Sequence, residues 1–157
     1  MNWSRIVLII AIASLAACGG SSSTAPTPTQ ASITVTLSPN PVTATACSPT
    51  CQGANGSFRF RADGTLTIQE TAGIGGNVNS ITAMHPNATI VFSVADIVQR
   101  SGTNHVAARG TLIVPLSTFT APLDNPNATR QAVVPYVVQF TDDRGNQLTG
   151  TVQWTVN

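Results

Sequence analysis

The chain has 157 residues, a formal net charge of +1 and only 8% charged residues. It contains seven arginines, no lysine and six acidic residues, and the arginines form no cluster. This balance argues against a nucleic-acid partner and against polybasic contact with a membrane, since both need concentrated positive charge. The length suits one domain with a real core once the N-terminal segment is set aside.

Residues 1–17 follow the order of a secretion signal. Arg5 is the single charge, and residues 6–17 are apolar except for Ser14. An apolar run of this length suits the central part of a signal peptide, and it is too short to cross a bilayer core of about 30 Å. We therefore predict a signal peptide over residues 1–17.

The signal ends in Leu15-Ala16-Ala17-Cys18, followed by Gly19. This motif resembles the lipobox of bacterial lipoproteins. The resemblance implies cleavage before Cys18, a diacylglycerol group on its sulfur and often an acyl chain such as palmitate on its amine, so that the protein is anchored to a membrane. Gly19 in place of Asp implies the outer membrane of a Gram-negative cell envelope rather than the inner membrane. The competing interpretation is a plain secretion signal with a cysteine near the cut.

Residues 18–31 are composed of Gly, Ser, Thr, Pro, Ala and one Gln after the cysteine. Such a composition cannot bury a core, so we predict a flexible linker between the lipid and a domain that spans residues 32–157.

Cys47 and Cys51 are left as an even pair if Cys18 carries the lipid. In an oxidising compartment such a pair predicts a disulfide, here a local clip on a loop that contributes about 2 kcal/mol. A redox pair or a metal site is less well supported. Redox motifs have two residues between the cysteines, and no His or acidic residue lies close in the sequence.

From residue 32 onward, apolar and polar side chains alternate with a period of two, which predicts strands over residues 32–37, 58–68, 78–84, 89–94, 107–116, 133–140 and 148–156. Asp63-Gly64 is expected to form a turn or bulge, and the Gly-rich residues 72–77 are expected to turn the chain. Residues 96–105 are expected to form a loop or a short helical turn, and residues 117–130 a long connection. No segment after the signal shows a convincing helical period.

Seven or eight short strands predict an all-β fold, an antiparallel β-sandwich. The last two strands, with Tyr136-Val137-Val138-Gln139-Phe140, Gly145-Asn146 and Thr151-Val152-Gln153-Trp154, resemble the last hairpin of bacterial immunoglobulin-like domains. The resemblance implies an immunoglobulin-like sandwich over residues 32–157. The inter-sheet cysteine pair and the central tryptophan of antibody domains have no counterpart here. Another sandwich or a small barrel is the alternative.

The residues of this chain suggest no catalytic set and no cofactor. His85 and His105 lie in predicted loops, and a metal carrier would need more converging His and Met than this chain has. A Gly-x-Ser-x-Gly turn for a nucleophilic serine is absent from the sequence. Phe119 lies in the predicted connection and is the aromatic residue that could bind a partner at the surface. The favoured interpretation is that Phe119 packs in the core.

Asp142, Asp143 and Asn146 form a weak calcium candidate, because adjacent carboxylates and an amide at a hairpin tip offer oxygen ligands. The favoured interpretation is a solvated turn, in which Asp, Gly and Asn serve the backbone geometry.

These features together predict a lipid-anchored, non-enzymatic module of the cell envelope that binds or scaffolds another envelope protein or a surface polymer. A periplasmic hydrolase and a small-molecule or metal carrier are the alternatives. In an immunoglobulin-like sandwich, the turn at residues 72–77 and the tip at residues 142–146 would share the tethered end with Cys18. The Cys47–Cys51 loop would then lie at the opposite end.

Overall fold

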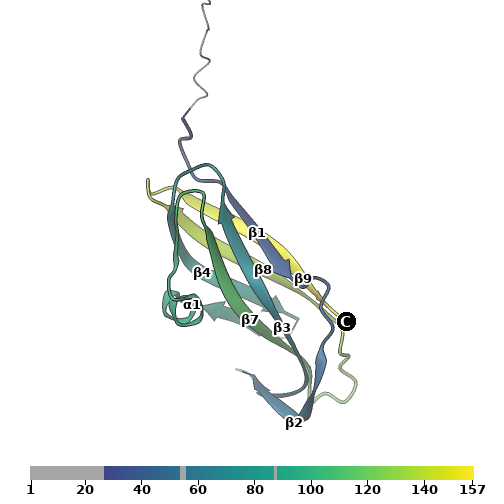
Figure 1. The fold of residues 1–157 in the computed structure, drawn as a ribbon. Coiled ribbons are helices and arrows are strands. Elements are labelled where there is room, and N and C mark those ends of the chain that lie inside the picture. The colour runs from purple at the N-terminus through teal and green to yellow at the C-terminus, as the bar shows by residue number, and fades with distance from the viewer. Residues whose placement is uncertain (1–26, 54–55, 87) are drawn as a thin grey trace, which may run out of the picture.

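The computed structural model describes residues 27–53, 56–86 and 88–157, and the predicted signal peptide, Cys18 and most of the predicted linker lie outside these ranges. Two antiparallel sheets pack face to face into a sandwich, with one short helix at the side (Figure 1). The all-β sandwich predicted from the alternation is therefore confirmed.

The first sheet is built around one long strand. β3 (Gly56–Glu70) pairs along one edge with β7 (Thr111–Pro122), and along the other edge with β1 (Ile33–Ser38) and then β2 (Thr45–Gly53). β1 pairs with the end of β3 near Glu70, and β2 pairs with the end near Gly56. The two short strands thus follow each other along the same edge.

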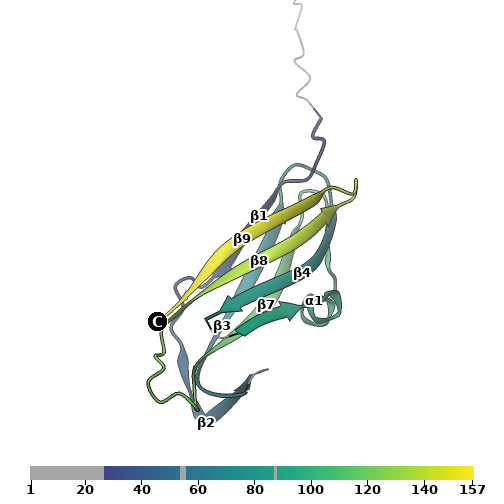
Figure 2. The same cartoon turned by 180° about the vertical axis from the view of Figure 1, so that it is seen from behind.

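The second sheet has the order β5-β4-β8-β9. It contains β4 (Gly76–His85), β5 (Ala88–Phe92), β8 (Ala132–Asp142) and β9 (Gln147–Val156), and the two-residue β6 (His105–Val106) continues the β5 edge of β4. β8 and β9 form a hairpin with ten paired positions, and Figure 2 shows their outer face. An isolated parallel bridge between Val42 and Val156 links the connection between β1 and β2 to β9.

The core lies between the inward faces of the sheets. Trp154, Tyr136, Phe140, Leu66 and Ile68 are all at most 1% exposed. The Trp154 indole donates a hydrogen bond to the Pro39 carbonyl at 2.8 Å, which satisfies its one polar atom.

Several local predictions differ from the structure, and three of them concern β3, β7 and the helix. Asp63 and Gly64 form no turn or bulge, since they pair in continuous register with Ser117 and Leu116. Gly64 is needed for another reason: a Cβ there would lie 2.6 Å from the Trp154 ring. The predicted connection also starts too early. Residues 117–122 belong to β7 because Thr118 and Thr120 turn inward opposite the β3 extension, and the true connection begins at Leu123.

The third difference is the extent of a helix: α1 (Val94–Ser101) has eight residues and starts at Val94, where a loop or a short helical turn was expected over residues 96–105. Ser93 and Asp96 form a capping box at its start, and Gly102 ends it in the left-handed conformation with φ of 79°. Ile97 is its one buried residue. The helix is therefore stabilised by its capping residues and by the packing of Ile97 rather than by a long apolar stripe. Within the described residues, the helix is not long and apolar enough to span a membrane.

Candidate functional site

The two ends of the sandwich differ in construction, and the sequence candidates divide between them. We call the end near β2 the distal end and define it by residues 47–53 and 123–131. We call the opposite end the N-terminal end and define it by residues 28–32, 70–76 and 142–146. Figure 1 shows the chain arriving at the N-terminal end and β2 lying at the other.

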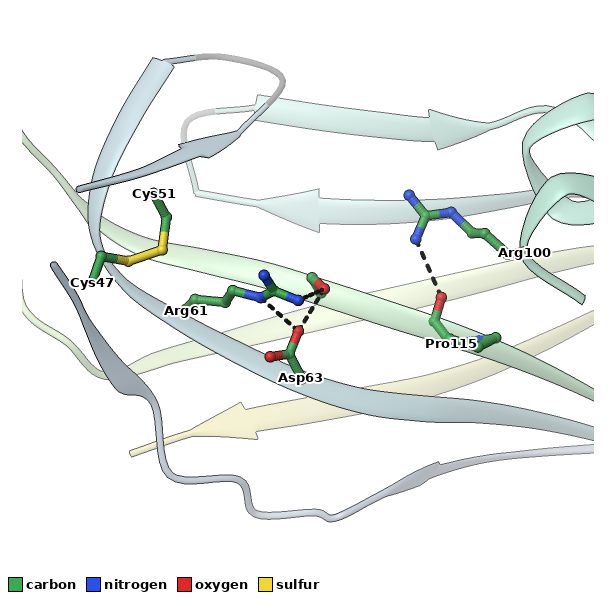
Figure 3. Close-up of polar contacts among 7 residues, drawn as sticks. Cys47, Cys51, Arg61, Asp63, Arg100 and Pro115 are labelled. Carbon is green, nitrogen blue, oxygen red and sulfur yellow. Dashed lines mark hydrogen bonds and ion pairs between the residues drawn. A yellow bond between two sulfur atoms is a disulfide. The ribbon is translucent and has the colours of Figure 1, made fainter. Parts of the chain in front are cut away.

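A disulfide joins Cys47 and Cys51 at the distal end (Figure 3). Ala46 pairs with Phe60 and Cys51 pairs with Phe58, so the residues between them leave the ladder opposite the single residue Arg59. Ser48 and Pro49 at the tip of this bulge are exposed. The predicted clip is therefore present, and it closes a protrusion within β2 rather than a free loop.

Phe119 packs beside this protrusion. Its ring stacks on Phe58 with 5.7 Å between the centroids, and the two rings lie so close to Gly53 that a Cβ there would meet both. Both phenylalanines are half-buried. Phe119 thus serves packing at the distal end and is not a free surface anchor.

Arg59 on β3 binds the connection that follows β7. Its guanidinium donates to the Asn125 carbonyl at 2.8 Å and to the Ala121 carbonyl at 3.5 Å, and the Leu123 N–H donates to the Ser57 carbonyl. Leu123 is nevertheless 47% exposed. The distal end therefore presents an exposed apolar side chain and a disulfide-closed tip on a braced frame.

A polar network lies on the outer face of the first sheet, next to the distal end (Figure 3). The Asp63 carboxylate accepts hydrogen bonds from Arg61 at 2.7 Å and from the Ser117 hydroxyl at 2.6 Å. Both members of the ion pair are about half exposed, at 49% and 58%. Such a pair contributes about 0–1 kcal/mol, so we assign this network to the surface rather than to a site.

The two histidines lie apart in the fold. His85 Nε2 is 3.3 Å from Thr118 Oγ1, and burial lowers the pKa of this histidine. His105 Nδ1 is 3.3 Å from the Asn77 side-chain oxygen. Within residues 27–53, 56–86 and 88–157, no group of three or more His, Cys, Asp and Glu side chains could hold a metal ion.

Asp142 is buried at the N-terminal end, with 4% of its surface exposed. Its carboxylate accepts hydrogen bonds from the N–H groups of Ala31, Arg144 and Asn146 and from the Asn146 side chain, at 2.8–3.0 Å. These donors outweigh the effect of burial and lower the pKa of Asp142 to about 2.

The geometry of this turn supports a backbone role over calcium binding. The Asp142 oxygens face N–H donors, the Asn146 amide donates to Asp142, and the Asp143 side chain is exposed. The three residues are close together, but Asp142 and Asn146 are already engaged with each other.

Glu70 is a second buried carboxylate at this end, 1% exposed, and it was not among the residues predicted to form a site. It accepts hydrogen bonds from the N–H groups of Ser32, Ala72, Gly73 and Arg109 at 2.7–3.2 Å. Burial alone would raise the pKa of Glu70. The four N–H donors have the larger combined effect and lower the pKa to about 2. The one available signal was its place in the alternation, as the next inward position after Leu66 and Ile68.

The chain reaches this end through residues 28–32, which are held by both carboxylates. Arg144 donates to the Pro28 carbonyl at 2.6 Å, and Asn146 donates to the Thr29 carbonyl at 3.3 Å. Among the described residues, contacts with the domain are therefore present from Pro28 onward, four residues before the boundary expected from composition. The predicted arrangement is confirmed for the described residues: residues 72–77 and 142–146 share the end at which the chain enters, and the Cys47–Cys51 tip lies at the other.

The comparisons with known proteins identify no family. No protein-family model matches the chain, and no curated protein sequence matches it. A similar solved structure is that of the Pseudomonas fluorescens alkylpurine DNA glycosylase AlkC bound to DNA containing an abasic site analog, with a TM-score of 0.41 and 11% sequence identity. The match covers 82% of this chain and 31% of the glycosylase, and a likeness at this level carries no argument about function.

Proposed function

We propose that this protein is a lipid-anchored, non-enzymatic immunoglobulin-like module of the bacterial cell envelope that presents its distal end to another envelope protein or a surface polymer. The observation that carries the proposal is the opposition of the two ends. Residues 28–32 enter at the end closed by Glu70 and Asp142, whereas the disulfide tip and Leu123 project from the other.

The strand order supports an immunoglobulin-like assignment. That fold places its strands A, B and E in one sheet and its strands C, F and G in the other. Here β1, β3 and β7 share one sheet, and β4, β8 and β9 share the other. The parallel bridge from Val42 to Val156 adds a contact between the N-terminal part of the chain and the last strand.

The lipobox-like motif at Cys18 supports the anchor. Two or more acyl chains hold a protein stably on a membrane, because each buried CH₂ contributes about 0.8 kcal/mol. An anchor there would direct the N-terminal end to the lipid and the distal end away from it. Gly19 favours the outer membrane.

Fractionation and fatty-acid labelling test the anchor. Cys18→Ser is expected to abolish labelling and to move the protein from the membrane to the soluble fraction. The matched control is Cys47→Ser with Cys51→Ser, which should keep both the label and the membrane location. A Cys18→Ser protein that still labels and still sediments with membranes would rule the anchor out.

Photo-crosslinking in the native host tests the distal end. A crosslinking residue at exposed Ser48 is expected to capture a reproducible partner. The same residue at exposed Thr36, on the outer face of the first sheet, serves as the control. Capture from Thr36 alone, or from neither position, would count against the distal end as the binding surface.

A further inference from the structure

The described strands of the second sheet carry no Asp, Glu, Lys or Arg on their outer face, where His105 on β6 lies beside Asn77. The other outward side chains are Asn, Ser, Thr and Met on β4, Thr and Val on β5, Val, Pro, Gln and Thr on β8, and Gln and Thr on β9. This face is the one turned toward the reader in Figure 2. The outer face of the first sheet differs, since it carries Arg59, Arg61 and Asp63.

Two shallow hollows follow each other along the β8–β9 hairpin on this uncharged face. The first, of about 440 Å³, is lined by Pro135, Val137, Thr151 and Gln153 together with Tyr136 and Val152. The second, of about 370 Å³, continues along the same two strands and is lined by Thr129, Gln131, Val133, Thr155 and Asn157 with Ala132 and Val156. Since Pro135 pairs with Gln153 and Val133 with Thr155, the hollows lie end to end and form one track.

The side chains of the track offer hydroxyl and amide groups beside aliphatic surface. Thr151, Gln153 and Thr155 can each donate and accept hydrogen bonds, while Val133, Pro135 and Val137 expose carbon. No charged residue lines either hollow. Arg130 lies next to Gln131 in the chain, but its guanidinium is over the Phe60 ring, 6.0 Å from the centroid.

We infer that this β8–β9 track binds a neutral linear glycan. A sugar chain presents hydroxyl groups on its edges and C–H groups on its faces, which match this mixture of polar and aliphatic side chains. An anionic polymer would find no cation on the track to offset its desolvation.

Binding should be weak for each sugar unit. No exposed aromatic ring lines the track, because Tyr136 is 1% exposed, and stacking on aromatic rings is therefore missing. We expect dissociation constants on the order of 1 mM for short oligosaccharides. Longer chains would gain by occupying both hollows together.

The inference rests on the proposed function and deepens it, because it names a polymer class and a surface that starts at the distal end, where Thr129 and Gln131 line the second hollow, and continues along β8 and β9. Its test uses the full lipidated chain, extracted in a polyoxyethylene detergent, since a maltoside detergent would itself offer a neutral sugar. The protein is applied to immobilised neutral polysaccharides (glucan, mannan, galactan and chitin) and to anionic polygalacturonate. We expect retention on at least one neutral polymer and none on polygalacturonate.

Two variants locate the site. Thr151→Lys places a long charged side chain in the first hollow and is expected to reduce retention more than 10-fold. Thr36→Lys adds the same charge on the opposite sheet and is expected to leave retention unchanged. Both positions are exposed, so the fold should tolerate either lysine, and matched melting temperatures would verify this.

Three results would overturn the inference: no retention on any neutral polymer, retention on polygalacturonate alone, or equal retention of the Thr151→Lys protein. Self-association blocked by Thr151→Lys, with no sugar retention, would instead identify the face as an interface between two copies. A failed Cys18→Ser fractionation test would remove the anchor and leave the glycan result standing, so the two failures are distinguishable.

Discussion

The backbone N–H of Ala31 donates a hydrogen bond to the Asp142 carboxylate across 3.0 Å, and the two residues are 111 positions apart in the chain. This contact joins the point where the chain enters the domain to the turn between the last two strands. It is buried, and the same carboxylate holds the backbone of the turn through Arg144 and Asn146. One side chain therefore organises two segments that the sequence separates widely.

Removing this carboxylate should loosen both segments. Asp142→Ala leaves the N–H groups of Ala31, Arg144 and Asn146 without their acceptor, and unsatisfied buried donors are costly. We expect the melting temperature to fall by more than about 5 °C and proteolysis near residues 28–31 to increase. Asp143→Ala is the control, since that side chain is exposed and should change little. Equal effects of the two substitutions would contradict the assigned role.

Acid should destabilise the fold through Glu70 and Asp142. The folded-state pKa of each is about 2, below the ordinary values of 4.5 and 3.8. A lowered pKa stabilises the fold at pH values above the ordinary pKa, and this contribution is lost as the pH falls toward 2. We expect a melting temperature that declines slightly below about pH 6.5, because the lowered pKa of His85 favours its neutral form in the folded state, and drops more steeply below about pH 4.5 as Glu70 and Asp142 are protonated.

Glu70→Gln isolates one half of this acid response. The amide keeps the shape of the side chain but not its charge, so the variant should start less stable at pH 7 and lose less stability between pH 5 and pH 2. Parallel thermal melts of the two proteins across this range provide the measurement. Curves of the same shape for the variant and the parent would show that Glu70 does not contribute.

Gly64 should tolerate no side chain. A Cβ would lie 2.6 Å from the Trp154 ring and 3.0 Å from the Ser38 carbonyl oxygen. Overpacking of this kind costs about 1–3 kcal/mol, so Gly64→Ala should lower the free energy of unfolding in urea by that amount. Thr65→Ala, at the next position of the same strand, should cost about 0.5 kcal/mol or less because the side chain does not face the core. An unchanged midpoint for Gly64→Ala would refute the contact.

Loss of the disulfide should have a small and local effect. Cys47 and Cys51 close a ring with a sequence separation of 4, and so short a loop contributes about 2 kcal/mol or less. The double substitution to serine should therefore keep the fold and mainly expose residues 47–53 to proteases. Limited proteolysis followed by mass spectrometry would locate the cuts. Global unfolding of the double variant would show that the clip supports more than the distal end.

The period-two alternation was enough to predict the sandwich, because inward and outward positions follow directly from the pleat of each strand. It failed where polar residues face inward. Thr118 and Thr120 are buried on β7, and their hydroxyl groups make the segment resemble a connection. The short helix was missed because Ile97 is its one buried residue, although Ser93, Asp96 and Gly102 were readable as caps.

The N-terminal end could be predicted only in part. The resemblance to immunoglobulin-like domains placed the two turns beside the point where the chain enters. It did not find the carboxylates that hold them. The partners of Glu70 include the N–H groups of Ser32 and Arg109, each more than 35 positions away, and local patterns carry no record of such contacts.

The opposition of the two ends has a mechanical consequence. A pull between Pro28 and Cys51 would run nearly parallel to β3, whose 15 residues connect the two ends. Hydrogen bonds in an antiparallel pair lie perpendicular to the strands, so such a pull loads the six paired positions of β1 and β3 in shear and all together. The sandwich is thus built to resist stretching along the axis that joins its two ends.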